Sequence, residues 1–423
     1  MSRSNAHSSL IGLALAAMLS PATTFATQNL YGQRLTAPDA SVVGFGNQAP
    51  TVSGDWIAVF GRLSGAAGDG RVYLFHRQSG VWSFAQEIAP ADGTGSQDSL
   101  AMANGLLFVG SPNAYNAALQ ADAGVVSVYA LQNEWVLQQT LNGYTAFEPG
   151  ETGFGTSLAI DGQTLYVGFP GYMTATGNPI GDVEAYDIST SMASYVAQIL
   201  PTVPQLDMDF GETLAAGSGM LAVGADNEGV PGVGVSAGAL HTFARSANAW
   251  IEQTVLTAAY PFAGDHFPNA IVIDSAQVIA ADVNYDSQGK QGPWGQVFSY
   301  GDAATGFSSQ TGVIGPDPSS IYGFNLFGMG ITSVSGMLLV AAPNTGDAGR
   351  VFAYRSDTGA AWSPVSIFVA KQLQTGDAFG VSMATDGKTL VVGAGEYGRS
   401  PPSGGAIYAF AYPPTDRIYA DGL

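Results

Sequence analysis

The chain has 423 residues, of which 46% are hydrophobic and 11% charged, with 56 glycines and no cysteine. This composition supports a large apolar core and excludes disulfides as a source of stability. The formal net charge of −20 argues against nucleic acid and anionic lipid as partners, because both would be repelled.

The first residues have the pattern of a secretory signal peptide. Arg3 precedes the short apolar run Leu10–Leu19, and Thr24-Phe25-Ala26 offers small residues for cleavage. This run is shorter than the roughly 20 apolar residues that a membrane helix needs, and no later stretch reaches that length. We therefore expect residues 1–26 to be removed, leaving a monomer without a membrane span that is secreted or periplasmic.

One motif then recurs through the rest of the chain. Each copy has a short alternating strand, a tight turn and a second, almost continuously apolar strand. Pairs such as Asn104-Gly105 and Asp161-Gly162 supply the positive φ that a two-residue hairpin turn needs. We interpret the Phe-Gly start of the copies as a packing contact between neighbouring repeats. The copies begin at Phe45, Ser96, Phe154, Phe210, His266, Phe327 and Phe379, which gives about 57 residues per copy.

A third strand follows a glycine in every copy, after a loop of variable length. A second turn then leads to an aromatic residue and a fourth strand. We interpret these aromatic residues as hairpin packing: Trp82, Trp135, Tyr195, Trp250, Phe307 and Trp362. The predicted third strands are Gly70–Phe75, Gly124–Ala130, Gly181–Asp187, Gly238–Ala244, Gly295–Tyr300, Gly349–Arg355 and Gly405–Ala411.

Four antiparallel strands repeated seven times predict an all-β fold, a seven-bladed β-propeller in which neighbouring blades cover each other. The last copy ends after its third strand, whereas NLYGQRLTAP from Asn29 matches the fourth-strand pattern FAQEIAP. We expect Asn29–Leu35 to complete the last blade and close the ring. The chain then consists of a signal peptide (1–26), a single propeller (27–412) and a C-terminal tail (413–423).

The pattern FG…GD…VGAP…G.VYVF resembles the FG-GAP repeat of bacterial secreted proteins and of the integrin α-subunit propeller. The resemblance covers about Asn29 to Tyr412. Many integrin-type blades bind calcium through a D-x-D-x-D-G-x-x-D loop between their first two strands. Here that connection is too short in every copy and carries at most one carboxylate, such as Asp55 or Asp161. The sequence therefore predicts no cofactor and does not favour calcium.

Scattered residues could carry chemistry but lack the context for it. Ser236 lies in a G-x-S-x-G match, yet it precedes a strand and no helix follows, as a nucleophile elbow requires. Arg355–Trp362 partly resembles the Asp-box of sialidase propellers, but the serine is out of register and arginines are few. The histidines His76, His241 and His266 have no evident partner. We interpret four carboxylates before the motif starts as turn caps, with a calcium shared between loops as the alternative: Asp207, Asp209, Asp265 and Asp377.

The variable loops between the second and third strands all belong on one face of the ring. Aromatic residues on loops of a rigid scaffold suit the binding of a protein or a sugar. We therefore predict a non-catalytic, adhesion-type propeller that recognises an extracellular protein or glycan. Two alternatives stay open: a purely structural surface component, and an exported glycan-active enzyme with converging carboxylates of raised pKa on this long-loop face. The candidate ligand residues are Tyr115, Tyr172, Tyr285, Trp294 and Tyr397.

Overall fold

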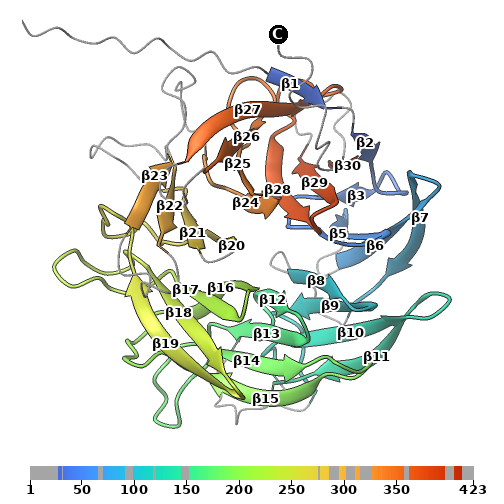
Figure 1. Cartoon of the computed structure of the whole chain (residues 1–423). Helices are drawn as coiled ribbons and strands as arrows, with labels where there is room; N and C mark the ends of the chain where they lie inside the picture. Colours follow the sequence, from blue (N-terminus) through green and yellow to red (C-terminus); the bar gives the residue numbers. More distant parts are fainter. Residues whose placement is uncertain are drawn as a thin grey trace, which may run out of the picture.

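The computed structural model describes residues 27–30, 32–64, 70–90, 99–117, 121–143, 152–274, 277–284, 295–301, 310–314, 326–334, 336–356, 362–395 and 404–411. Seven sheets stand in a ring around a common axis (Figure 1). Each sheet is built on four strands in antiparallel order, two of the sheets have one additional short strand, and the described residues form no helix. The predicted all-β, seven-bladed propeller is therefore confirmed.

The strands occur in the order predicted for the repeat, and the second strand is buried along its whole length in most blades. Blade 1 contains β4 (Thr51–Ser53), β5 (Trp56–Leu63), β6 (Gly70–Gln78) and β7 (Val81–Ile88), with the short β3 (Val42–Val43) beside β5. Blade 2 contains β8 (Ser99–Ala103), β9 (Leu106–Ser111), β10 (Val125–Leu131) and β11 (Trp135–Leu141). Blade 3 contains β12 (Leu158–Asp161), β13 (Thr164–Phe169), β14 (Asp182–Asp187) and β15 (Ser194–Ile199). Blade 4 contains β16 (Phe210–Gly217), β17 (Met220–Ala225), β18 (Ala239–Ser246) and β19 (Ala249–Leu256).

The remaining blades follow the same order. Blade 5 contains β20 (Ala270–Asp274), β21 (Gln277–Asp282), β22 (Gln296–Tyr300) and β23 (Gln310–Ile314). Blade 6 contains β24 (Ile331–Val334), β25 (Met337–Ala342), β26 (Arg350–Arg355) and β27 (Ser363–Ala370). Blade 7 contains β28 (Phe379–Thr385), β29 (Thr389–Ala394) and β30 (Ala406–Ala411).

The N-terminal segment forms two short strands instead of the one predicted over Asn29–Leu35. Of these, β2 (Gln33–Leu35) pairs antiparallel with β30, in the position of a fourth strand of blade 7. The preceding β1 (Thr27–Leu30) pairs parallel with β27 of blade 6. Gly32 lies between them, where an added Cβ would meet the Phe410 ring at 2.3 Å, so the chain passes this ring with no room for a side chain.

In the copies whose start the structure describes, the phenylalanine at the start of the motif packs a blade on its predecessor. The Phe154 N–H donates to the Ala123 carbonyl at 3.0 Å, and a Cβ on the next residue, Gly124, would lie 2.3 Å from the Phe154 oxygen. Only glycine fits at such a close approach. The same contacts join blade 7 to blade 1, where Phe45 N–H donates to Gly404 at 2.9 Å. The motif phenylalanines are fully buried: Phe45, Phe154, Phe210, Phe267, Phe327 and Phe379.

Hydrogen bonds join neighbouring blades at both faces of the ring. Near the long-loop end, Ser99 Oγ donates to the Gly155 carbonyl at 2.7 Å, and Ser157 Oγ donates to the Gly211 carbonyl at 2.6 Å. At the tight-turn end, the Asp161 carboxylate accepts the Gly219 N–H at 2.7 Å. The hairpin turn predicted at Asp161-Gly162 is present: Asp161 pairs with Thr164 at the end of β12, and Gly162 and Gln163 form the turn. The Asp161 carboxylate also holds the turn of the next blade.

The repeated aromatic position at the fourth strand is structural, as predicted. Trp82 and Trp135 are buried, and Trp250, Trp362 and Tyr195 pack at the edges of interblade core clusters. Phe307 lies outside the described residues.

Candidate ligand-binding site on the long-loop face

Two of the five aromatic residues predicted to contact a ligand lie in described loops. Tyr115 follows β9 in blade 2 and exposes 52% of its surface. Tyr172 in blade 3 packs at a core cluster beside Phe169, with ring centroids 6.0 Å apart. The structure thus leaves Tyr115 free to meet a ligand and uses part of Tyr172 for packing. Tyr285, Trp294 and Tyr397 lie outside the described residues.

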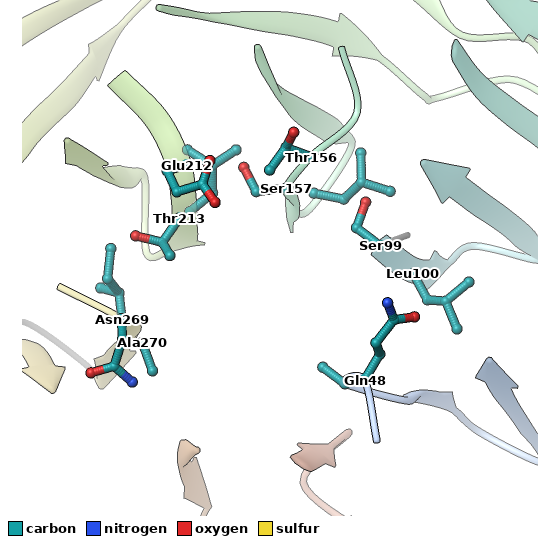
Figure 2. Close-up of a pocket in the computed structure, with 13 residues that line it drawn as sticks. Gln48, Ser99, Leu100, Thr156, Ser157, Glu212, Thr213, Asn269 and Ala270 are labelled. Atoms are coloured by element: carbon teal, nitrogen blue, oxygen red, sulfur yellow. The ribbon is translucent and has the colours of Figure 1, made fainter. Parts of the chain in front are cut away.

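A cavity of about 400 Å³ opens where the first strands of five blades begin (Figure 2). The Ser99, Ser157 and Thr213 hydroxyls that line it also donate to backbone carbonyls of the next blade. These bonds hold part of the lining in place. Figure 2 shows the polar side chains around the open space: Gln48, Ser99, Thr156, Ser157, Glu212, Thr213 and Asn269.

Glu212 is the only acidic residue among the described residues that line the cavity. Burial raises its pKa to about 7, and the charges of Asp226 and Asp209 add to this effect. Burial, followed by the same kind of repulsion, raises the pKa of Asp209 to about 6. Burial also raises the pKa of Asp226, although His266 opposes it with Nδ1 3.8 Å from Asp226 Oδ2. These three carboxylates would be stabilised by a cation beside them.

The carboxylates predicted to cap turns divide into two groups. Asp265 Oδ2 accepts the Phe262 N–H, and Asp377 Oδ2 accepts the Gln374 N–H, each at 2.7 Å, so both are caps. Asp207 and Asp209 instead have φ of 55°, and Asp209 lies close enough to Asp226 and Asp207 for their charges to raise its pKa. Within the part of the chain that the structure describes, no group of three or more His, Asp or Glu side chains is placed to hold a metal ion.

Three loops at the long-loop end of blade 4 contact one another, and we call them together the blade-4 loop surface: residues 200–209, 226–238 and 257–269. Gln205 Nε2 donates to the Glu228 carboxylate at 2.8 Å and to the Gly229 carbonyl at 3.1 Å. Asn227 Nδ2 donates to the Asp207 carbonyl at 2.6 Å. The third loop joins through the Gly264 N–H, which donates to the Val235 and Ser236 carbonyls.

Apolar side chains are exposed along this surface. Val235 exposes 77%, Val203 73% and Tyr260 68% of their surface, and they come from three different loops. The set is Leu200, Val203, Leu206, Val233, Val235, Tyr260 and Phe262. Most other large exposed apolar residues lie on outer fourth strands of the ring, such as Val81, Val136 and Ile251. The blade-4 loop surface therefore carries the main apolar exposure of the described long-loop face.

A buried histidine supports these loops from below, which corrects the expectation that no histidine has a partner. His241 Nε2 lies 2.7 Å from Glu228 Oε2, and His241 Nδ1 lies 2.5 Å from Glu252 Oε1. Glu252 also accepts the Thr202 N–H at 2.8 Å, so the group ties two loops to β18 and β19. Burial alone would lower the pKa of His241, but the bonds and charges of the two glutamates outweigh it and raise the pKa.

The other histidines also have neighbours: His76 stacks on Trp56 with ring centroids 4.3 Å apart, and His266 faces Asp226. Only His241 had a signal in the sequence, as a polar residue in the inward pattern of a third strand. Glu228 lies in a loop, so spacing could not have paired it. Ser236 precedes β18 and donates to Asn227 Oδ1, with no histidine side chain in that bond. Residues 357–361 of the Asp-box resemblance lie outside the described residues.

Residues 362–410 match the family model of the FG-GAP repeat. The match runs from the fourth strand of blade 6 through nearly all of blade 7. Together with the seven repeated blades, it supports an FG-GAP β-propeller. No curated protein matches the chain. The described residues contain no helix long and apolar enough to cross a bilayer.

Proposed function

We propose that this FG-GAP β-propeller is a secreted, non-catalytic protein that binds an extracellular protein or glycan through its long-loop face. The observation that supports it is a contrast between the two faces of the ring. At the long-loop face, exposed apolar side chains lie on loops, and a cavity lined by both polar and apolar residues opens there. At the other face, turns such as those at Asp161 and Asp386 are tied to the turn of the next blade.

The long-loop face is also suited to binding in its energetics. Removing exposed apolar side chains from water lowers the free energy, so a partner that covers them is bound more tightly. The loops that carry them are fixed by hydrogen bonds among themselves, so little ordering entropy is lost on binding.

The test is a binding screen of residues 27–423 on a glycan array and on a panel of extracellular proteins. A long-loop variant would carry Val203→Ser, Val235→Ser and Tyr260→Ser. A matched control would carry Val81→Ser and Ile251→Ser, which change apolar residues of similar exposure on the outer strands. We expect a ligand that is lost only in the long-loop variant. A ligand lost only in the control would place binding elsewhere, and no ligand in any condition would favour the structural alternative.

The enzyme alternative keeps one observation in its favour: Glu212, Asp209 and Asp226 have raised pKa values on this face. Glycoside hydrolysis needs two carboxyl groups that flank one bond. Among the described residues that line the cavity, Glu212 is the only one with a carboxyl group. Hydrolysis of a glycan by the wild type, abolished by Glu212→Gln, would replace the binding proposal with a catalytic one.

A further inference from the structure

We propose that the blade-4 loop surface (200–209, 226–238 and 257–269) docks a polypeptide segment that carries lysine or arginine next to apolar residues. The inference rests on the proposed binding function and names its partner. It stands on the apolar exposure, the fixed geometry and the charge of this surface.

The apolar part of the surface is shared by three loops. Val203 and Leu206 come from the first loop, Val233 and Val235 from the second, and Tyr260 and Phe262 from the third. A lone exposed apolar residue is ordinary, but a group of this kind on adjoining loops is typical of a protein contact site. Tyr260 in addition offers a ring face on which a guanidinium could stack.

The geometry of the surface is set before any partner arrives. The first and second loops are joined through Gln205 and Asn227, and the second and third through Gly264. Beneath them, His241 holds Glu228 of the second loop. A peptide would therefore meet a preformed surface, which favours recognition of a short segment.

The negative charge of the surface favours a partner with basic residues. The three loops contain five acidic residues and no lysine or arginine, namely Asp207, Asp209, Asp226, Glu228 and Asp265. Glu228 is engaged by His241, and Asp265 caps a turn. Asp207 is exposed, and Asp209 and Asp226 interact with Glu212 of the cavity. A lysine or arginine would relieve this repulsion, an anionic lipid or nucleic acid would add to it, and a neutral glycan would leave it unchanged.

The test is selection of a random dodecapeptide library on phage against residues 27–423, followed by affinity measurement with the enriched synthetic peptides. We expect enrichment of lysine or arginine beside aliphatic or aromatic residues. The variant Val203→Ser, Val235→Ser, Tyr260→Ser should bind these peptides at least about tenfold more weakly. A charge variant, Asp209→Asn, Glu212→Gln, Asp226→Asn, should lose about tenfold and show a weaker salt dependence.

Two controls keep the outcome decisive. The outer-strand variant Val81→Ser, Ile251→Ser should bind like the wild type, and thermal unfolding should show each variant to be folded. Peptides without basic residues, or affinity that is unchanged in the charge variant, would overturn the proposal. A glycan bound in the array while no peptide is enriched would overturn this partner and leave the proposed function standing. Absence of peptide, protein and glycan ligands would contradict both.

Discussion

The side-chain amide of Gln33 forms two hydrogen bonds with the backbone of Trp82, its Nε2 donating to the carbonyl at 2.6 Å and its Oε1 accepting the N–H at 2.8 Å. Gln86 makes the same pair of bonds with Trp135, at 2.9 and 2.8 Å. Gln139 makes it with Ala193, at 3.0 and 2.8 Å. Because Gln86 and Gln139 lie on fourth strands, Gln33 on β2 occupies the equivalent place in blade 7.

This equivalence predicts that Gln33→Ala destabilises the ring. The change would leave a backbone N–H and a carbonyl of Trp82 without their partner, which costs about 1–3 kcal/mol. Urea unfolding of residues 27–423 measures the effect, with Gln86→Ala as the positive reference. Gln138→Ala is the matched control, because its exposed amide bonds only its own strand, at Val136. Closure of the ring by β2 would be refuted by a Gln33→Ala variant as stable as Gln138→Ala.

The close contact between blades predicts a large effect at Gly168. A Cβ there would lie 2.1 Å from the Gly211 oxygen and 2.2 Å from Ser157 Oγ, so blades 3 and 4 would have to separate. We expect Gly168→Ala to cost about 3 kcal/mol or more, at the upper end of overpacking effects. Gly217→Ala is the control, because its nearest contact is an ordinary 3.7 Å to Ile273. Equal urea midpoints for the two variants would show that the interface yields at little cost.

The fold could be predicted because the same local signals recur in most of the seven copies of the repeat. Positive-φ glycines, buried second strands and the aromatic position of the fourth strand each agree across copies. The N-terminal segment was predicted only in part, since nothing in its sequence indicated that Thr27–Leu30 would pair with blade 6. Most of the candidate site could not be predicted from the sequence, because the loops that form it are not part of the repeated pattern. Val203, Val235 and Tyr260 lie far apart in the chain, and only the folded loops bring them to one surface.

The buried histidine predicts how stability depends on pH. The pKa of His241 is raised in the folded protein, so its contribution is fully present below the unfolded value of about 6.5 and is lost as pH rises through the folded pKa. Burial alone would raise the pKa of Glu252, but hydrogen bonds from His241 and Thr202 lower it. That contribution is present above the unfolded pKa of Glu252 and is lost as pH falls through the folded one.

Urea unfolding from pH 5 to 9 would compare the wild type with His241→Gln, which keeps a neutral hydrogen-bonding side chain. We expect the wild type to exceed the variant most between the unfolded pKa of Glu252 and that of His241. The difference should shrink as pH rises further, and Leu200–Asp209 should then exchange its amide hydrogens faster. A difference that grows with pH would show that His241 is neutral in the folded protein.

Unlike the substitutions above, replacing the cavity carboxylate Glu212 should increase the stability of the folded protein. The pKa of Glu212 is raised to about 7, so its ionised form is disfavoured in the folded protein and its contribution is lost as pH rises through that value. Glu212→Gln removes this charge and should stabilise the protein at pH 8 by on the order of 1 kcal/mol, allowing for its partial exposure. At pH 5 the two proteins should be nearly equal. Glu134→Gln, in an exposed turn before β11, controls for the general loss of one negative charge. If Glu212→Gln were destabilising at pH 8, the carboxylate would have a stabilising partner in the folded state. A lysine or arginine of a bound peptide would then contribute less to binding through Glu212.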